Sequence, residues 1–284
     1  MLIVNGTAVE ETNPTIPLLN RSFRYGDGLF ETIRVFRGRP LFLSQHLERL
    51  FSGLELLKMN RSNAFFREEV AEQILRLIQL NQLDEHGRIR LHLYRQGEGA
   101  YLPTQNSPGY LIEGFALKHD YYSRSAAVSI CPFREVELAA NPLSKVKSAN
   151  SLPYILAALF AKEQGYEEGI LFHQGFVSEA SSANVFVVKK QKLLTPGLES
   201  GCLPGIMRQE IIQLSRRLKI PVQEKRIRWK DLLQAEEIFL TNAIRGIIGV
   251  NKVENRTFSN SQSAMTAFLR KCFLQYISEI HGKF

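Results

Sequence analysis

Six segments spread along this chain of 284 residues carry the side chains that could do chemistry. A lysine amine can bind an aldehyde covalently and move protons, and the first amides of a helix attract an anion such as phosphate. No P-loop, paired-histidine metal helix, nucleophile elbow or dinucleotide fingerprint occurs, and the GDG motif alone indicates only a turn. The segments are FRYGDGLFETIRV (23–35), QHLERL (45–50), VKSANSLPYILA (146–157), VSEASSANVFVV (177–188), LPGIMR (203–208) and FLTNAIRGI (239–247).

Strand and helix patterns alternate along the chain and must position these segments. Two short apolar runs joined by a glycine predict a hairpin near the N-terminus, and alternating polar and apolar residues predict half-buried strands. Apolar residues at helical spacing predict helices. The expected strands are 2–5, 7–9, 88–95, 109–117, 126–131, 169–173, 184–189 and 237–241, and the expected helices are 46–57, about 63–80, about 151–164, about 205–218 and about 263–281.

A polar stretch at 118–124 separates the two halves of the pattern and predicts a domain boundary. We therefore expect an α+β chain of two domains, a smaller N-terminal domain at 1–120 and a larger C-terminal domain at 121–284. A ligand is expected in the cleft between such domains.

Composition narrows the function classes. The chain is 44% apolar with a net charge of +8, and its basic clusters lack the interleaved aromatics of a nucleic-acid surface, so we expect a solvated basic face that attracts a small anion. The start MLIVNGTAVEE lacks the features of a signal peptide, and no apolar run could cross a bilayer, so a cytoplasmic protein without membrane contact is expected. Three scattered cysteines predict neither a disulfide framework nor a metal site.

Taken together and in this order, the six segments resemble the class IV, or fold type IV, pyridoxal-phosphate enzymes. This family includes branched-chain aminotransferases, D-amino-acid aminotransferases and 4-amino-4-deoxychorismate lyases. The resemblance covers about residues 3–250. It implies a small N-terminal α/β domain, a larger C-terminal pseudo-barrel domain with pyridoxal 5′-phosphate in the cleft between them, and a homodimer whose partner chain contributes to the active site.

The resemblance also implies roles for two chemically active residues. Lys147, in KSANSL, corresponds to the catalytic lysine that binds the cofactor aldehyde and moves protons at the substrate carbon. Glu179, in VSEASSANVF, corresponds to the carboxylate that keeps the pyridine nitrogen protonated, so that the ring can accept negative charge. Considered singly, Lys147 could be a surface charge, as Lys145 could, and Glu179 could face solvent.

Two segments match the binding site for the cofactor phosphate. Gly205, Ile206 and Met207, at the expected start of a helix, are predicted to approach the phosphate through their backbone, although PG could equally be only a turn. Arg49 in QHLERL corresponds to the arginine that pairs with the phosphate, and Asn242 lies where a further polar group approaches it. A surface arginine on an amphipathic helix is the alternative for Arg49.

The substrate side is expected at Phe30, which matches an aromatic position of the family, with Glu31 as a weaker candidate. The loop after Arg95, QGEGAYLP, has no arginine for a substrate carboxylate, although the lyases and D-amino-acid enzymes generally place one there. Arg90 or Arg95, or the neighbouring Arg88, could take that role. Arg90 corresponds roughly to a carboxylate-binding strand arginine of branched-chain enzymes.

Three positions favour one family member over another. Leu152 stands five residues after Lys147, where branched-chain enzymes usually carry a tyrosine and the lyases and D-amino-acid enzymes tend to have leucine. Met207 stands where branched-chain enzymes favour threonine, and Asn242 stands where transaminases more often have serine or threonine. The sequence therefore predicts an aminodeoxychorismate lyase that makes 4-aminobenzoate for folate synthesis from a small anionic amino substrate. A class IV aminotransferase of the branched-chain or D-amino-acid type is the alternative, and a non-catalytic binding protein is a third hypothesis.

Overall fold

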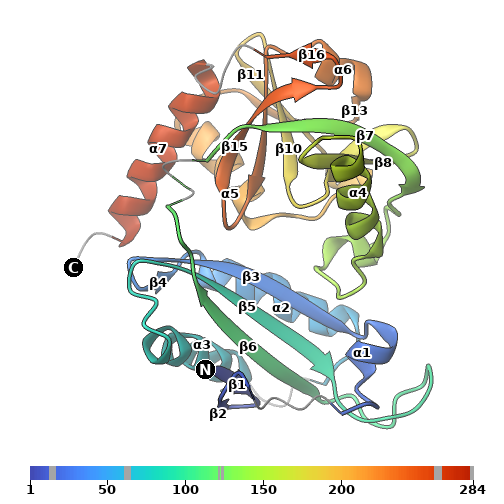
Figure 1. Ribbon diagram of the computed structural model, residues 1–284, viewed down its shortest axis with the longest axis vertical. Helices are drawn as coiled ribbons and strands as arrows, with labels where there is room; N and C mark the ends of the chain where they lie inside the picture. The colour runs from blue at the N-terminus through green and yellow to red at the C-terminus, as the bar shows by residue number, and fades with distance from the viewer. Residues whose placement is uncertain (13–16, 61–64, 121, 123–124, 259–263, 282–284) are drawn as a thin grey trace. The chain divides into compact units, whose positions relative to one another are not determined.

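The computed structural model describes residues 1–12, 17–60, 65–120, 122, 125–258 and 264–281 (Figure 1). Their contacts divide the chain into two compact units. The first unit is Met1–His119 together with Val146–Asn150, and the second is Asp120–Lys145 together with Ser151–Phe284. The division therefore lies close to the expected boundary at 120/121, except that the short stretch containing Lys147 packs with the N-terminal unit.

The first unit is an antiparallel sheet of six strands in the order β2-β1-β6-β5-β3-β4, with helices packed on one face. Strands β3 and β5 pair along the whole of β3, from Gly28 with Tyr94 to Phe36 with His86. The elements are β1 (Leu2–Val4), β2 (Thr7–Val9), α1 (Arg21–Tyr25), β3 (Gly28–Phe36), β4 (Arg39–Pro40), α2 (Leu43–Leu56), α3 (Phe65–Leu80), β5 (His86–Arg95) and β6 (Pro108–Ala116).

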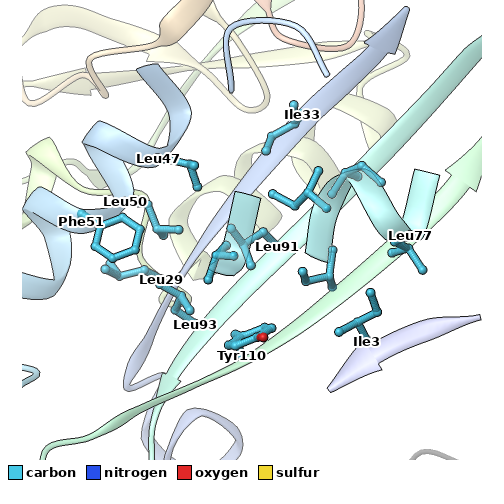
Figure 2. Packing of buried hydrophobic residues seen from close by; sticks show 14 of the residues in the cluster. Ile3, Leu29, Ile33, Leu47, Leu50, Phe51, Leu77, Leu91, Leu93 and Tyr110 are labelled. Carbon is cyan, nitrogen blue, oxygen red and sulfur yellow. The ribbon is translucent and has the colours of Figure 1, made fainter. Parts of the chain in front are cut away.

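Side-chain alternation gives this sheet an apolar face and a polar one. Leu29 and Ile33 of β3 and Leu91 of β5 are buried against the apolar stripes of α2 and α3, as Figure 2 shows with Leu47, Leu50 and Leu77. Because successive side chains of a strand point to opposite faces, the residues between them, such as Phe30 and Arg90, lie on the other face. The polar face is where the functional side chains of this unit gather.

The second unit is built on one mixed sheet of ten strands, ordered β12-β11-β10-β14-β15-β7-β8-β9-β13 with β16 beside β15. Strands β9 and β13, near one end of this order, contact β11 near the other, so the sheet nearly closes into a barrel. Its elements are β7 (Val128–Glu137), a 3-10 turn (Pro142–Lys145), α4 (Leu152–Glu163), β8 (Glu168–His173), β9 (Phe176–Ala180), β10 (Asn184–Lys189), β11 (Lys192–Pro196), a 3-10 turn (Leu198–Ser200), α5 (Ile206–Arg217), β12 (Val222–Lys225), β13 (Ile227–Arg228), α6 (Trp229–Leu233), β14 (Glu237–Asn242), β15 (Gly246–Val253), β16 (Arg256–Thr257) and α7 (Ala264–His281).

The expected α+β class and the barrel-like second unit are confirmed. Every helix and strand predicted from the sequence has a counterpart, with bounds that differ by a few residues except at β7, which continues to Glu137 instead of ending at 131. The starts predicted for the second and last helices, at 63–64 and 263, lie outside the described residues. Several elements were not predicted, above all β3, which begins at the second glycine of GDGLFE. Within the described part of the chain, no helix is long and apolar enough to cross a membrane.

Candidate active site

The segment that contains Lys147 runs beside the start of β3, the strand that begins within the GDGLFE motif. The amide of Phe30 donates to the carbonyl of Lys147 at 2.9 Å, and the amide of Ala149 donates to the carbonyl of Gly28 at 2.9 Å. Gly26 has a φ of +65°, and a Cβ there would lie 2.5 Å from the Asn150 side chain. Two motifs more than 100 residues apart in sequence therefore pair through their backbones in one unit.

Phe30 lies against two cations on the polar face of the first sheet. The Nζ of Lys147 lies 4.6 Å from the centre of the Phe30 ring, and the Cζ of Arg90 lies 4.2 Å from it. A ring this close to two cations attracts both through its electron-rich face. Lys147, Phe30 and Arg90, which the sequence placed in one site, are thus neighbours in the structure.

The two candidate arginines for a substrate carboxylate have different surroundings. The Arg90 side chain is 40% exposed, packs on the Phe30 ring and forms a long ion pair of 3.7 Å with Glu113, and burial lowers its pKa. The Arg95 side chain, 9% exposed, bonds Asp27 at 2.9 Å, Asn106 at 2.6 Å and the carbonyl of Leu57 at 2.6 Å. Because its guanidinium holds together the end of β5 and the following loop, this placement argues for Arg90 as the substrate residue.

Glu31 is a buried partner of Arg49. Its carboxylate accepts from Arg49 Nε at 2.7 Å, from Arg49 Nη2 at 2.6 Å and from His46 Nδ1 at 2.7 Å. Burial alone would raise the pKa of Glu31, but the Arg49 guanidinium and His46 outweigh it and lower that pKa to about 2. Burial lowers the pKa of His46, so the imidazole is neutral and its Nδ1–H donates to the carboxylate. Glu31 therefore orients Arg49 and does not face the substrate side.

Replacing Glu31 by glutamine should destabilise the protein in a pH-dependent way. The pKa of Glu31 is lower in the folded chain than its ordinary value of 4.5, so its stabilisation is complete above pH 4.5 and is lost as the pH falls towards 2. We expect Glu31→Gln to reduce the free energy of unfolding by about 3 kcal/mol at pH 7. Urea unfolding from pH 7 to pH 3 should show the difference shrinking below pH 4.5, whereas Glu48→Gln, at an exposed position next to Arg49 on α2, should cost nothing measurable. A difference independent of pH would contradict this origin.

In the second unit, Glu179 near the end of β9 is buried and receives three hydrogen bonds. Its Oε1 accepts from the Tyr154 hydroxyl at 2.8 Å and from the Leu203 amide at 3.0 Å, and its Oε2 accepts from Asn184 Nδ2 at 3.2 Å. Hydrogen bonds to a carboxylate favour its charged form. The buried Cys202 beside it stays a thiol, because burial and the charge of Glu179 raise the pKa of Cys202 to about 12.

The connection that follows Glu179 is held by a second buried carboxylate. Glu168, at the start of β8, accepts from the amide of Ser182 at 3.0 Å and from the hydroxyls of Ser181 and Ser182. The Ser181 amide donates to the carbonyl of Gly169 at 2.9 Å. This anchoring fixes the chain between Glu179 and Asn184, so that both reach the same place.

Gly205 caps the N-terminus of α5 at a point where no side chain fits. A Cβ on Gly205 would lie 1.9 Å from the Asn184 side-chain oxygen, while Asn184 Nδ2 donates both to Glu179 and, at 2.9 Å, to the carbonyl of Leu203. The Gly205 amide donates to that same carbonyl at 2.8 Å, and the next two amides, of Ile206 and Met207, begin the helix without intrahelical acceptors. Asn184 thus couples the predicted ring carboxylate to the predicted phosphate turn.

Asn242 shapes the turn between β14 and β15. Its Oδ1 accepts from the amides of Ile244 at 3.1 Å and Arg245 at 2.8 Å. Tyr122 links this turn to α5, because its hydroxyl donates to the carbonyl of Ala243 at 2.6 Å and lies 3.9 Å from the Met207 sulfur. The two segments predicted around the phosphate are therefore neighbours in the second unit, and Asn242 acts first on the shape of its own turn.

Each unit by itself offers groups that suit part of pyridoxal phosphate. In the second unit, a glycine-capped helix start offers amides to a phosphate, and a buried carboxylate that accepts from three donors suits a protonated pyridine nitrogen. In the first unit, an amine beside an aromatic ring suits the aldehyde. Among the described residues, no cluster of histidine, cysteine, aspartate or glutamate is suited to a metal ion.

The family model for class IV amino-transferases matches residues 28–253. The chain belongs to the class IV aminotransferase family. Its sequence is 28% identical, over 100% of this chain and 97% of the relative, to aminodeoxychorismate lyase of Bacillus subtilis (strain 168). It is 25% identical, over 91% of this chain and 90% of the relative, to D-alanine aminotransferase of Bacillus licheniformis. A branched-chain aminotransferase of Thermoproteus uzoniensis has a similar structure, with a TM-score of 0.88, 25% identity, and coverage of 99% of this chain and 95% of that one.

Membership of this family confirms the resemblance inferred from the six segments. It also confirms the expected cofactor, pyridoxal 5′-phosphate. It does not separate lyase from aminotransferase, because relatives of both kinds match at similar identity.

Several polar residues of the second unit were missed from the sequence, among them Tyr154, Glu168 and Asn184. Glu168 and Asn184 each begin a strand of otherwise apolar residues, EGILF and NVFVV, and a polar residue at such a strand start is a usable signal. Tyr154 lies in a mainly apolar helix, where an aromatic residue normally indicates core, so its sequence context carried no such signal.

Proposed function

We propose that this enzyme is a pyridoxal-phosphate-dependent lyase that converts 4-amino-4-deoxychorismate to 4-aminobenzoate and pyruvate, in cytoplasmic folate synthesis. The observation that supports it most is the placement of Lys147 and Arg90 beside Phe30, which puts a proton-transferring amine and an anion-binding group on the same face of one sheet. The lyase relative that matches the whole chain adds to it, as do Leu152 and Met207, where branched-chain enzymes differ, and Asn242, where transaminases differ.

We assign the residues as follows. Lys147 binds the cofactor aldehyde, and Glu179 faces the pyridine nitrogen. The amides of Gly205, Ile206 and Met207 bind the phosphate. Arg49, oriented by Glu31, adds positive charge to it, and Asn242 shapes the neighbouring turn. When bound, the cofactor supplies an electron sink for the charge left on the substrate carbon.

In the proposed reaction, Lys147 removes the proton from the carbon that carries the amine. The carbon–oxygen bond to the enolpyruvyl group then breaks, its electron pair leaves with the oxygen, and the ring becomes aromatic. Lys147 returns a proton to the departing group, which is released as pyruvate. Atoms balance without water or a redox partner, and Arg90 and Phe30 hold the substrate carboxylate and ring during these steps.

An aminotransferase is the second candidate, and the relatives of that activity favour it. In that reaction Lys147 would return the proton to a carbon of the cofactor. The amino group would then stay with the cofactor and be passed on to a keto acid. Both reactions begin with the same proton removal, so the residues near Lys147 serve either one.

The test is to incubate the purified enzyme with aminodeoxychorismate and measure 4-aminobenzoate and pyruvate. Parallel incubations with single L- and D-amino acids would monitor conversion of the bound cofactor to its amine form by absorbance. We expect equimolar 4-aminobenzoate and pyruvate. Cofactor conversion by amino acids without these products would replace the lyase proposal with the aminotransferase.

Replacing Arg90 by glutamine should raise KM for the anionic substrate while kcat changes little. A hydrogen bond to a charged group contributes about 1.5–3 kcal/mol, so the increase should be roughly 10-fold to 100-fold. Arg88→Gln is the matched control, because Arg88 lies two residues away on β5, packs on Phe115, and is exposed. An unchanged KM in Arg90→Gln, or an equal rise in Arg88→Gln, would remove Arg90 from the site.

We also propose that the protein is a homodimer. The supporting feature is the α4 stripe: Leu152, Ile155, Leu156 and Leu159, which recur at helical spacing with 46–69% of their surface exposed. Exposed aliphatic side chains in one row are typical of an interface.

A Leu159→Glu variant tests the dimer, because a carboxylate in the middle of the stripe would be buried without a partner on association. We expect light scattering to give twice 32.4 kDa for the wild type and 32.4 kDa for the variant. Leu80→Glu, at a similarly exposed leucine on α3, should stay dimeric. A monomeric wild type would overturn the proposal.

A further inference from the structure

Tyr154 has no role in the function proposed above, yet its hydroxyl lies 2.8 Å from the Oε1 of Glu179. It stands in the first turn of α4, seven residues after Lys147 and two after Leu152. Two residues correspond to about 200° around an α-helix, so Tyr154 and Leu152 point to opposite sides. Leu152 is 69% exposed, whereas the Tyr154 side chain turns inward to the carboxylate.

The ring of Tyr154 is held in place by packing. It lies against a small core formed by Phe133, Leu138, Ala157 and Leu171. Helix α4 approaches β8 closely there, since a Cβ on Gly169 would lie 2.4 Å from the carbonyl of Ala157. The fixed ring holds the hydroxyl within 2.8 Å of Glu179, to which it donates.

The hydroxyl remains a donor throughout the neutral pH range. Burial, the negative charge of Glu179 and the hydrogen bond to it all raise the pKa of Tyr154 far above its ordinary value. A phenol that keeps its proton stabilises the carboxylate as an anion. When a carboxylate shares a proton with a pyridine nitrogen, stabilising the anion keeps that proton on the nitrogen.

We propose that Tyr154 is a positioning residue for the cofactor, whose hydroxyl holds Glu179 in the orientation and the charged form that a protonated pyridine nitrogen requires. The proposal rests on the role of Glu179 proposed above. It does not depend on whether the enzyme is a lyase or an aminotransferase, because both need the protonated ring.

The experiment compares the full-length wild type with Tyr154→Phe, Glu179→Gln and Tyr276→Phe. Tyr276→Phe is the matched control, because it removes another tyrosine–glutamate hydrogen bond of the same unit, from Tyr276 to Glu210 at 3.3 Å, between α7 and α5. Each apoprotein is titrated with pyridoxal phosphate to obtain Kd, and the absorbance of the bound cofactor is recorded from pH 5 to pH 10. Thermal unfolding of the apoproteins measures stability separately.

For Tyr154→Phe we expect Kd to rise roughly 10-fold to 100-fold, the worth of a hydrogen bond to a charged group. We also expect its cofactor spectrum to change with pH in the same direction as that of Glu179→Gln, by a smaller amount. Tyr276→Phe should bind cofactor like the wild type even if it unfolds at a lower temperature.

Two results would overturn the inference in distinguishable ways. If Glu179→Gln shifts the spectrum and Tyr154→Phe does not, Tyr154 has no positioning role although Glu179 keeps its own. If Glu179→Gln itself leaves Kd and spectrum unchanged, the assignment of Glu179 fails and the inference fails with it. An equal effect of Tyr276→Phe would show a general loss of packing.

Discussion

Replacing Lys147 by alanine should abolish turnover of any amino substrate and prevent covalent attachment of the cofactor. The variant loses both the amine that binds the aldehyde and the general base, and loss of a positioned base alone costs roughly 10²–10⁴-fold in rate. Folding should be unaffected, because what pairs with β3 is the backbone of this segment, through the carbonyl of Lys147. Steady-state assays and the absorbance spectrum of the protein with added pyridoxal phosphate measure both effects.

Lys145→Ala is the matched control for this prediction. Lys145 lies two residues away in the same segment of sequence, is exposed, and belongs to the second unit rather than the first. It should keep wild-type turnover and spectrum. An active Lys147→Ala variant, or an inactive Lys145→Ala variant, would mean that another lysine binds the cofactor.

Glu179→Gln is expected to have the second largest effect, a fall in kcat of roughly 10²–10³-fold, comparable to the loss of one preorganised electrostatic group in other enzymes. A neutral amide cannot keep the pyridine nitrogen protonated, so the ring accepts charge less well. The amide also brings an N–H group next to the donors from Tyr154, Leu203 and Asn184. Binding of substrate should change less than kcat, because Glu179 belongs to the cofactor side.

The control for this prediction is Glu236→Gln, an exposed carboxylate of the same unit that accepts from the Lys190 amide at 2.9 Å. It should leave kcat unchanged. A Glu179→Gln enzyme with nearly full kcat would show that the ring needs no anionic partner here.

Much of the fold could be predicted because its signals are local. The helices over 152–163 and 206–217 and the strand over 184–189 follow apolar periodicity and capping glycines, which depend on neighbouring residues alone. Strand β3 was missed because GLFETIRVF mixes charged and apolar residues on both faces: Glu31 sits on the core-facing side, where its pairing with Arg49 and His46 makes burial tolerable. That pairing is a tertiary contact, which periodicity does not reveal.

The candidate site was predictable by residue identity but not by arrangement. The order of the motifs predicted Lys147, Glu179 and Gly205 as site residues. No local pattern, however, indicated that residues 146–150 pack with the N-terminal unit and pair with β3. Arg95 illustrates the same limit. An arginine at a strand end could bind a substrate carboxylate, but here Asp27, Asn106 and a backbone carbonyl occupy its guanidinium.

The structure also shows why supporting residues escape motif reasoning. Asn184 acts only through others: it bonds Glu179, holds the carbonyl of Leu203 and lies against Gly205. Its role depends on contacts between three segments of the chain. The sequence alone does not indicate which residues of these segments come into contact.

The most direct test of the account is to locate the lysine that carries the cofactor. The wild-type enzyme with bound pyridoxal phosphate would be reduced with borohydride, digested, and its peptides analysed by mass spectrometry. The account predicts one stoichiometric adduct, on Lys147, in the peptide that contains SANSLPY. An adduct on Lys145 or on any other lysine, or a protein that yields no adduct, would contradict it.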